Sequence, residues 1–292
     1  MPTKKTKDKT ILVTGATGHQ GNSSMRHLRE RGFPVRVLTR DPDAPHARSL
    51  TGHGVEVERG DLNDPASLTR ALDEVYGVHS VQDSKAGPDA EIRMGKNLAD
   101  AARQATISHF VYSSVASADQ RTGIPHFDSK FRVEEHLRAG GMPYTIVRPV
   151  FFMENWLAMR QDIESGTLHM PLDPSTRLQM VAVDDIGGVV AMAFEKPGKW
   201  QGQVFELAGD ELSMTELAEA FSVTVGHEVR YVQIPWDQFE QKAGKEYTIM
   251  YRWFQSIGYH VGIASVRQQY PSLSTFPRWL NAHWNTAVQT AT

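Results

Sequence analysis

The sequence contains no cysteine, which excludes disulfide bonds, zinc sites built on thiolates and a thiol nucleophile. It also lacks an excess of either charge, since 31 Lys and Arg face 34 Asp and Glu and the formal net charge is -3. Nothing in that balance attracts nucleic acid or anionic lipid. The longest uncharged apolar stretch, residues 186–194, is far shorter than a membrane span. We therefore expect a cytoplasmic protein with no membrane or direct nucleic-acid partner, and a disordered tail over residues 1–9.

What the sequence does contain is a regular alternation of short apolar runs and longer amphipathic stretches, beginning at Thr10. This alternation is typical of parallel strands joined by helices. After about Phe151 the rhythm is less even, although strand-like pieces recur. The predicted strands span 11–13, 35–38, 55–57, 78–81, 110–113, 144–147, 179–183, 204–207 and 230–233, and the main predicted helices span 18–31, 65–72, 90–104 and 127–138.

Three glycines follow the first predicted strand at a GxxGxxG spacing: Gly15, Gly18 and Gly21. The first permits a tight turn, the second lets a pyrophosphate approach the backbone, and the third lets the helix pack close to the strand. The positive end of that helix would face the anion. A plain glycine-rich turn is the competing interpretation, but the strand before and the helix after favour dinucleotide binding. The other candidate cofactor-binding residues of this loop are Thr17, His19 and Gln20.

These observations predict an α/β protein with a Rossmann-like doubly wound parallel sheet and a smaller C-terminal α/β lobe. Residues 10–155 would form the NAD(P)-binding domain. Residues 156–292 would form a smaller substrate or partner lobe that shares late strands with the main sheet.

The choice of cofactor is expected at the end of the second strand, where an acid would bind the ribose 2′-hydroxyl and a base a 2′-phosphate. No acid stands at the strand tip, and Arg40 can offer a planar guanidinium to a phosphate. This favours NADP(H) over NAD, with a solvated surface arginine as the alternative; Asp41 and Asp43 argue mildly against it. After the third strand, Asp61 and Leu62 are placed to flank the adenine, although Asp61 could equally be a loop cap.

A second group of candidates is the run His126, Phe127, Asp128, Ser129 and Lys130 at the start of a predicted helix. At i and i+4, His126 and Lys130 would share one face, about 6 Å apart. Lys130 could bind the ribose next to the nicotinamide, and His126 is a tentative second catalytic residue. The alternative is an exposed pair on an amphipathic helix.

With these motifs and several others, the sequence resembles the NmrA-like family of atypical short-chain dehydrogenases/reductases. The further matching segments are Gly95-Lys96-Asn97, Tyr112-Ser113-Ser114 and the run from Arg148-Pro149 through Phe152 to Glu154-Asn155. By position, the resemblance implies that the glycines and Arg40 hold the phosphates, Lys130 the nicotinamide ribose, and the segment from Pro149 to Phe152 the nicotinamide face. Ser113 and Gln82 would also lie near the cofactor.

The chain departs from that family pattern in three places. His126 stands where a catalytic tyrosine is usual, four residues before the lysine, and the usual Ser/Thr position falls on Val115. The segment Gln82-Asp83-Ser84 replaces small or apolar residues near the cofactor. These departures argue against ordinary carbonyl reduction.

Two functions follow from the resemblance. One is a redox-sensing regulator that reports NADP(H) occupancy to a protein partner. The other is an NADPH-dependent reductase of a quinone, enone or related small acceptor that uses Lys130 without the usual tyrosine. A structural relic with a partly closed groove is a third interpretation, and a homodimer remains an option. No metal site is expected, since the histidines show no ligand spacing. The aromatic residues that could line a substrate pocket or pack a core are Trp236, Phe239, Tyr247, Tyr251, Trp253 and Phe254.

Overall fold

A computed structural model describes residues 8–51, 54–82 and 86–284. Most of the tail expected at residues 1–9, together with Asp83 and Ser84, therefore lies outside the described residues. The chain divides into two compact units, one of residues 1–120, 125–148 and 186–205, the other of 121–124, 149–185 and 206–292. The domain boundary expected after residue 155 stays a prediction.

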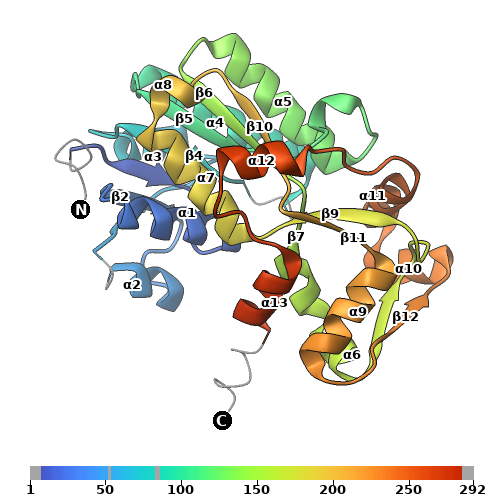
Figure 1. The fold of residues 1–292 in the computed structure, drawn as a ribbon. Helices are drawn as coiled ribbons and strands as arrows, with labels where there is room; N and C mark the ends of the chain where they lie inside the picture. Colours follow the sequence, from blue (N-terminus) through green and yellow to red (C-terminus); the bar gives the residue numbers. More distant parts are fainter. Residues whose placement is uncertain (1–7, 52–53, 83–85, 285–292) are drawn as a thin grey trace. The chain divides into compact units, whose positions relative to one another are not determined.

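The first unit is built on a seven-stranded sheet in the order β10-β6-β5-β4-β1-β2-β3 (Figure 1). Neighbouring strands from β6 to β3 pair in parallel. The strand order reverses at β1, so the predicted doubly wound fold is confirmed. The strands are β1 (Ile11–Val13), β2 (Val35–Thr39), β3 (Glu56–Arg59), β4 (Gly77–Ser80), β5 (His109–Ser113), β6 (Tyr144–Pro149) and β10 (Val204–Leu207).

Helices α3, α4 and α5 supply the apolar core on one face of this sheet. There Leu12, Val78 and Phe110 pack with Leu98 of α4 and Val133 of α5, all fully buried. Because both faces of a parallel sheet are covered, its strands read as continuous apolar runs, which made them predictable. The helices are α1 (His19–Glu30), α2 (Pro45–Thr51), α3 (Pro65–Ala71), α4 (Pro88–Gln104), α5 (Pro125–Gly140), α7 (Val183–Glu195) and α8 (Pro197–Trp200).

A capping residue explains why α3 begins where the sequence predicts. Asp64 accepts a hydrogen bond from the Ala66 amide, and Pro65 occupies the first turn of α3, as expected. Helix α2 was not predicted, since only Ala47 and Leu50 of its seven residues are buried and no apolar periodicity is visible. No helix in the described part of the chain is long and apolar enough to span a bilayer.

The other face of the sheet buries two histidines, His79 of β4 and His109 of β5. Phe194 of α7 packs edge-on against His109, with ring centroids 5.3 Å apart. The Nε2 of His109 lies 2.8 Å from the Thr145 hydroxyl, which in turn donates to the Trp200 carbonyl. His79 is fully buried, and neither ring nitrogen has a hydrogen-bond partner in the described part of the chain. Burial lowers the pKa of His79 from 6.5 to about 3 and that of His109 to about 4.

These histidines predict a loss of stability in mild acid. As the pH falls from 6.5 to 4, both imidazoles take up protons in the unfolded chain before they do so in the folded chain, so the free energy of unfolding falls with the pH. His79 alone accounts for about 3 kcal/mol over that interval. Thermal unfolding of wild type and His79→Leu at several pH values tests this. The variant should lose much of the acid sensitivity, whereas parallel pH profiles would show that His79 is not its source.

The second unit contains two small sheets and most of the aromatic residues. One sheet has the strand order β11-β9-β7, in which β11 is antiparallel and β7 is parallel to β9. The other sheet is the parallel pair of β8 and β12. The strands are β7 (Phe151–Phe152), β8 (Thr167–Met170), β9 (Arg177–Val181), β11 (Asp210–Ser213) and β12 (Arg230–Gln233). The helices are η3 (Met153–Met159), α6 (Arg160–Glu164), α9 (Met214–Val225), α10 (Trp236–Ala243), α11 (Lys245–Ser256), α12 (Ile263–Gln269) and α13 (Phe276–His283).

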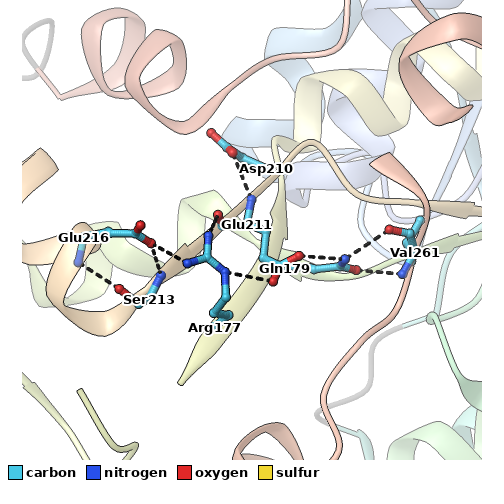
Figure 2. A network of polar contacts seen from close by, with 7 residues as sticks. All are labelled: Arg177, Gln179, Asp210, Glu211, Ser213, Glu216 and Val261. Carbon is cyan, nitrogen blue, oxygen red and sulfur yellow. Dashed lines mark hydrogen bonds and ion pairs between the residues drawn. The ribbon is translucent and has the colours of Figure 1, made fainter. Parts of the chain in front are cut away.

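A polar network holds β9 to its neighbours (Figure 2). The Gln179 amide donates to the Val261 carbonyl and accepts from the Val261 amide, as a strand residue would. Arg177 forms ion pairs with Glu211 of β11 and Glu216 of α9. Glu216 and Ser213 complete a capping box at the start of α9. This network is structural.

Three of the aromatic residues of α11 are packed in a core. Tyr251, Trp253 and Phe254 are all buried, and Phe254 packs on both Phe151 and Tyr259. Those contacts favour the core interpretation for these three rings. The remaining rings of the predicted group are half-buried in the case of Trp236 and Phe239 and exposed in the case of Tyr247.

Candidate functional site

The glycine loop has the geometry that its spacing predicts. Gly15 adopts a left-handed backbone with φ of +65°, which favours glycine, and its carbonyl accepts the Gly18 amide at 2.9 Å. A Cβ on Gly21 would lie only 2.3 Å from the Gly15 carbonyl oxygen. A Cβ on Gly18 would approach nothing closer than 3.4 Å. Gly21 is therefore required for packing, whereas the space beside Gly18 is open to a ligand.

The start of α1 is left without neutralising groups. Gly18 is the N-cap and provides no side chain, and the first turn holds no acidic residue. Among the described residues, no acceptor is bonded to the backbone amides of His19, Gln20 and Gly21. Unpaired amides and the helix dipole together make a binding site for an anion.

Side chains from neighbouring strands hold this loop in place. The Thr14 hydroxyl bonds both the carbonyl and the amide of Val81 at 2.8 Å. Ser113, at the end of β5, donates to the Gln20 side chain at 2.6 Å. Gln82 is buried and donates to Ser80, while its own carbonyl oxygen has no partner within the described ranges. The predicted residues Ser113 and Gln20 are thus brought together beside the glycine loop.

The ends of β2 and β3 form a hollow of about 250 Å³ that gathers three arginines. Arg40 follows β2, Arg59 ends β3, and Arg70 lies in the last turn of α3. Arg40 and Arg70 make no ion pair within the described residues, and Arg59 pairs with Asp43 at 3.4 Å. The remaining residues of the hollow are Gly60, Asp61, Asp64 and Ser67. Such a group of guanidinium ions suits a phosphate.

The acids around this hollow are engaged in local contacts. Asp43 pairs with Arg48 and Arg59, and one Asp41 oxygen accepts the Asp43 amide. Asp61 accepts from the backbone and side chain of Asn63, as a loop cap does. The carbonyl of Leu62 accepts from Asn97 of α4, which ties this loop to the core. These acids therefore leave Arg40 available to a ligand.

Lys130 is fixed by a buried partner that the sequence did not indicate. Its Nζ donates to Oε1 of Glu91 at 2.7 Å, and the Ser129 hydroxyl donates to Oε2 of the same carboxylate. Glu91 lies in the first turn of α4 and is fully buried. His126 is half-buried and packs edge-on against Phe127, with ring centroids 5.0 Å apart. Both His126 and Lys130 belong to α5, as predicted.

A second buried ion cluster lies beneath Ser114. Glu134 of α5 accepts from Ser114 at 2.5 Å and forms a bidentate pair with Arg148. Burial, followed by the charges of Glu91 and Glu134, raises the pKa of Tyr112 well above 10. Tyr112 is also fully buried in the apolar core under the sheet, so it cannot reach a substrate and does not replace the tyrosine for which His126 stands.

The remaining predicted residues lie elsewhere. Pro149 and Phe152 belong to the second unit, so their expected role at the nicotinamide stays a prediction. Val115 is nearly buried, and Ser113 ends β5 as expected. Sequence reasoning missed Arg59, Arg70 and Glu91, which come to the site from separate elements. Within the described residues, no group of three or more potential metal ligands is present.

Residues 7–278 match the model of the NmrA-like family. The chain belongs to the NmrA-like family. The resemblance inferred from its motifs is thereby confirmed.

Proteins similar to this NmrA-like chain include both enzymes and a regulator. An NAD(P)H azoreductase of Xenophilus azovorans is 35% identical over 233 residues, which cover 79% of each chain. The Citrobacter sp. triphenylmethane reductase, solved with NADP(H), has the same fold, with a TM-score of 0.83, 24% identity and coverage of 94% of this chain and 99% of the other. The negative transcriptional regulator NmrA, solved with NADP, gives a TM-score of 0.81 at 25% identity over 98% of each chain.

Proposed function

We propose that this NmrA-like protein binds NADP(H) and uses it to reduce a small acceptor of the quinone or enone class. The observation that carries the cofactor assignment is the hollow lined by Arg40, Arg59 and Arg70, at the strand ends where a 2′-phosphate would lie. The solved relatives that carry NADP(H) or NADP support the same choice.

The residues present fit a dinucleotide along this edge of the sheet. The free amides of His19, Gln20 and Gly21 would bind the pyrophosphate, and the absence of a Cβ on Gly18 leaves room for it. Arg40, with Arg59 and Arg70, would bind the 2′-phosphate through charge-assisted hydrogen bonds. Lys130 would donate to the ribose beside the nicotinamide.

Reduction of a quinone or enone in such a site depends more on how the nicotinamide and the acceptor are positioned than on a strong general acid. When bound, the nicotinamide supplies a hydride. The Lys130 ammonium contributes a fixed positive charge and hydrogen-bond donors, which would orient the ribose and stabilise negative charge that develops on an acceptor. The similarity to an azoreductase at 35% identity favours an enzyme. The cytoplasmic location, the small-molecule acceptor and the homodimer that the sequence suggests as an option stay expectations.

A redox-sensing regulator is the second candidate. His126 stands in place of the usual tyrosine, and the fully buried Tyr112 is not a suitable replacement. The NmrA regulator matches over nearly the whole chain. In that case NADP(H) occupancy would alter a surface offered to a protein partner.

Steady-state oxidation of NADPH against a panel of quinones, enones, azo compounds and aldehydes separates the two candidates. We expect turnover with at least one quinone, enone or azo acceptor and little with simple aldehydes. Tight NADPH binding without turnover of any acceptor would contradict the reductase and leave the regulator.

Lys130→Met tests the site more locally. We expect about a tenfold loss both in NADPH affinity and in the rate with the best acceptor, because a charged donor to the ribose is lost. Lys242→Met, at an exposed position on α10, is the matched control and should behave as wild type. Equal affinities and rates in wild type and Lys130→Met would remove Lys130 from the proposed site.

A further inference from the structure

The carboxylate of Glu91 is enclosed between α4 and α5. Its side chain is only 1% exposed, and its two oxygens accept from two consecutive residues of α5, Ser129 and Lys130. Those contacts direct both oxygens toward the first half of α5. The carboxylate therefore belongs to α4, but both of its hydrogen bonds are to side chains of α5.

The spacing between the two helices is fixed one turn further along. Gly95 follows Glu91 by four residues and faces Val133, which follows Ser129 by four. A Cβ on Gly95 would lie 2.7 Å from Cγ2 of Val133, so the helices meet through the glycine. Neither helix can withdraw without opening this contact, so the close packing at Gly95 holds the backbones that carry Glu91 and Lys130 near one another.

Stability alone does not account for this ion pair. Desolvation of two charges offsets most of their attraction, and an apolar pair of the same size is often as stable or more so. What the ion pair does is fix the position of the Lys130 ammonium group. Lys130 has three N–H donors, its side chain is 13% exposed, and Glu91 is its only hydrogen-bonded acceptor among the described residues. Two donors remain for a ligand.

We infer that Glu91 is a positioning residue, which holds the Lys130 ammonium where it meets the nicotinamide-side ribose. This inference rests on the proposed function of Lys130. Without the carboxylate, a long flexible side chain would move among its rotamers and meet the ligand in the required place only part of the time.

The test compares the rate at which Lys130 is acetylated in wild type and in Glu91→Gln. This substitution keeps the size of the side chain and one acceptor oxygen but removes the negative charge. Cofactor-free protein is labelled with acetic anhydride, and the Lys130 peptide is quantified by mass spectrometry relative to exposed Lys242. We expect Lys130 to be acetylated about fivefold faster in Glu91→Gln, since breaking a buried pair frees the amine. With NADPH and an acceptor, kcat should fall about tenfold while KM for NADPH changes less than threefold, because the phosphate contacts are intact.

Ser129→Ala is the matched control, because it removes the other hydrogen bond to the same carboxylate and keeps the ion pair. Its Lys130 labelling should stay within about twofold of wild type. Glu91→Asp keeps the charge on a shorter side chain and should give intermediate labelling, which provides a test if Glu91→Gln does not fold. A purely structural Glu91 would give equal Lys130 labelling in wild type and in the folded Glu91 variants, and that result overturns the inference. Failure of NADP⁺ to bind wild type, or to protect Lys130 from acetylation, would instead overturn the proposed function.

Discussion

Gly18→Val should abolish NADPH binding, with a loss of about 100-fold or more in affinity, while the protein still folds. The Gly18 backbone, at φ −99° and ψ 173°, is extended and accepts a β-branched residue. A Cβ at Gly18 would come no closer than 3.4 Å to the Gly15 oxygen, so it causes no clash, and we expect the branched side chain to occupy the space proposed for the pyrophosphate. Calorimetric titration with NADPH and far-ultraviolet circular dichroism measure the two effects separately.

Gly21→Ala is the contrasting variant in the same loop. Its Cβ would lie 2.3 Å from the Gly15 carbonyl oxygen and 2.6 Å from the Ala16 amide nitrogen, both of them backbone atoms. Overpacking of this kind costs about 1–3 kcal/mol or more, so the melting temperature should fall clearly. A folded Gly18→Val protein that binds NADPH as tightly as wild type would mean that the loop is only a structural turn.

Arg40→Ala should remove most of the preference for NADPH over NADH. A charge-assisted contact contributes about 1.5–3 kcal/mol with a 2′-phosphate, which corresponds to about 10- to 100-fold in affinity, and little with a hydroxyl. Affinity for NADH should change less than threefold, because its pyrophosphate contacts lie at α1. Titrations of both cofactors into wild type and variant measure the change in the ratio.

Arg59 and Arg48 provide a graded control for Arg40. Arg59 lines the hollow but also pairs with Asp43, so Arg59→Ala should reduce the preference by a smaller factor. Arg48 pairs with the same aspartate and does not line the hollow, so Arg48→Ala should leave the preference unchanged. An unchanged NADPH to NADH ratio in Arg40→Ala would place the 2′-phosphate elsewhere.

The glycine loop and the parallel sheet could be predicted from sequence because their signals are local. Buried strands such as Ile11–Val13 are continuous apolar runs, and Gly15 and Gly21 occupy positions that a turn and a close helix require. Arg40 was predictable for the same reason, since its role follows from its place directly after a strand.

The parts that sequence could not supply are assembled from distant segments. Glu91 reads as an ordinary acid in a helix, and only the packing of α4 on α5 brings it to Lys130, 39 positions away. Arg59 and Arg70 join Arg40 because β2 and β3 are paired and α3 follows. The burial of His79 in β4 likewise depends on the elements that cover the sheet, which no local pattern reveals.

We propose that the arginine hollow and the glycine loop together select NADP(H). Isothermal titration of the wild-type protein with NADPH and with NADH, in the same buffer, tests it most directly. We expect one site per chain and an NADPH affinity at least about tenfold above that for NADH. Equal affinities for the two cofactors, or no binding of either, would contradict it.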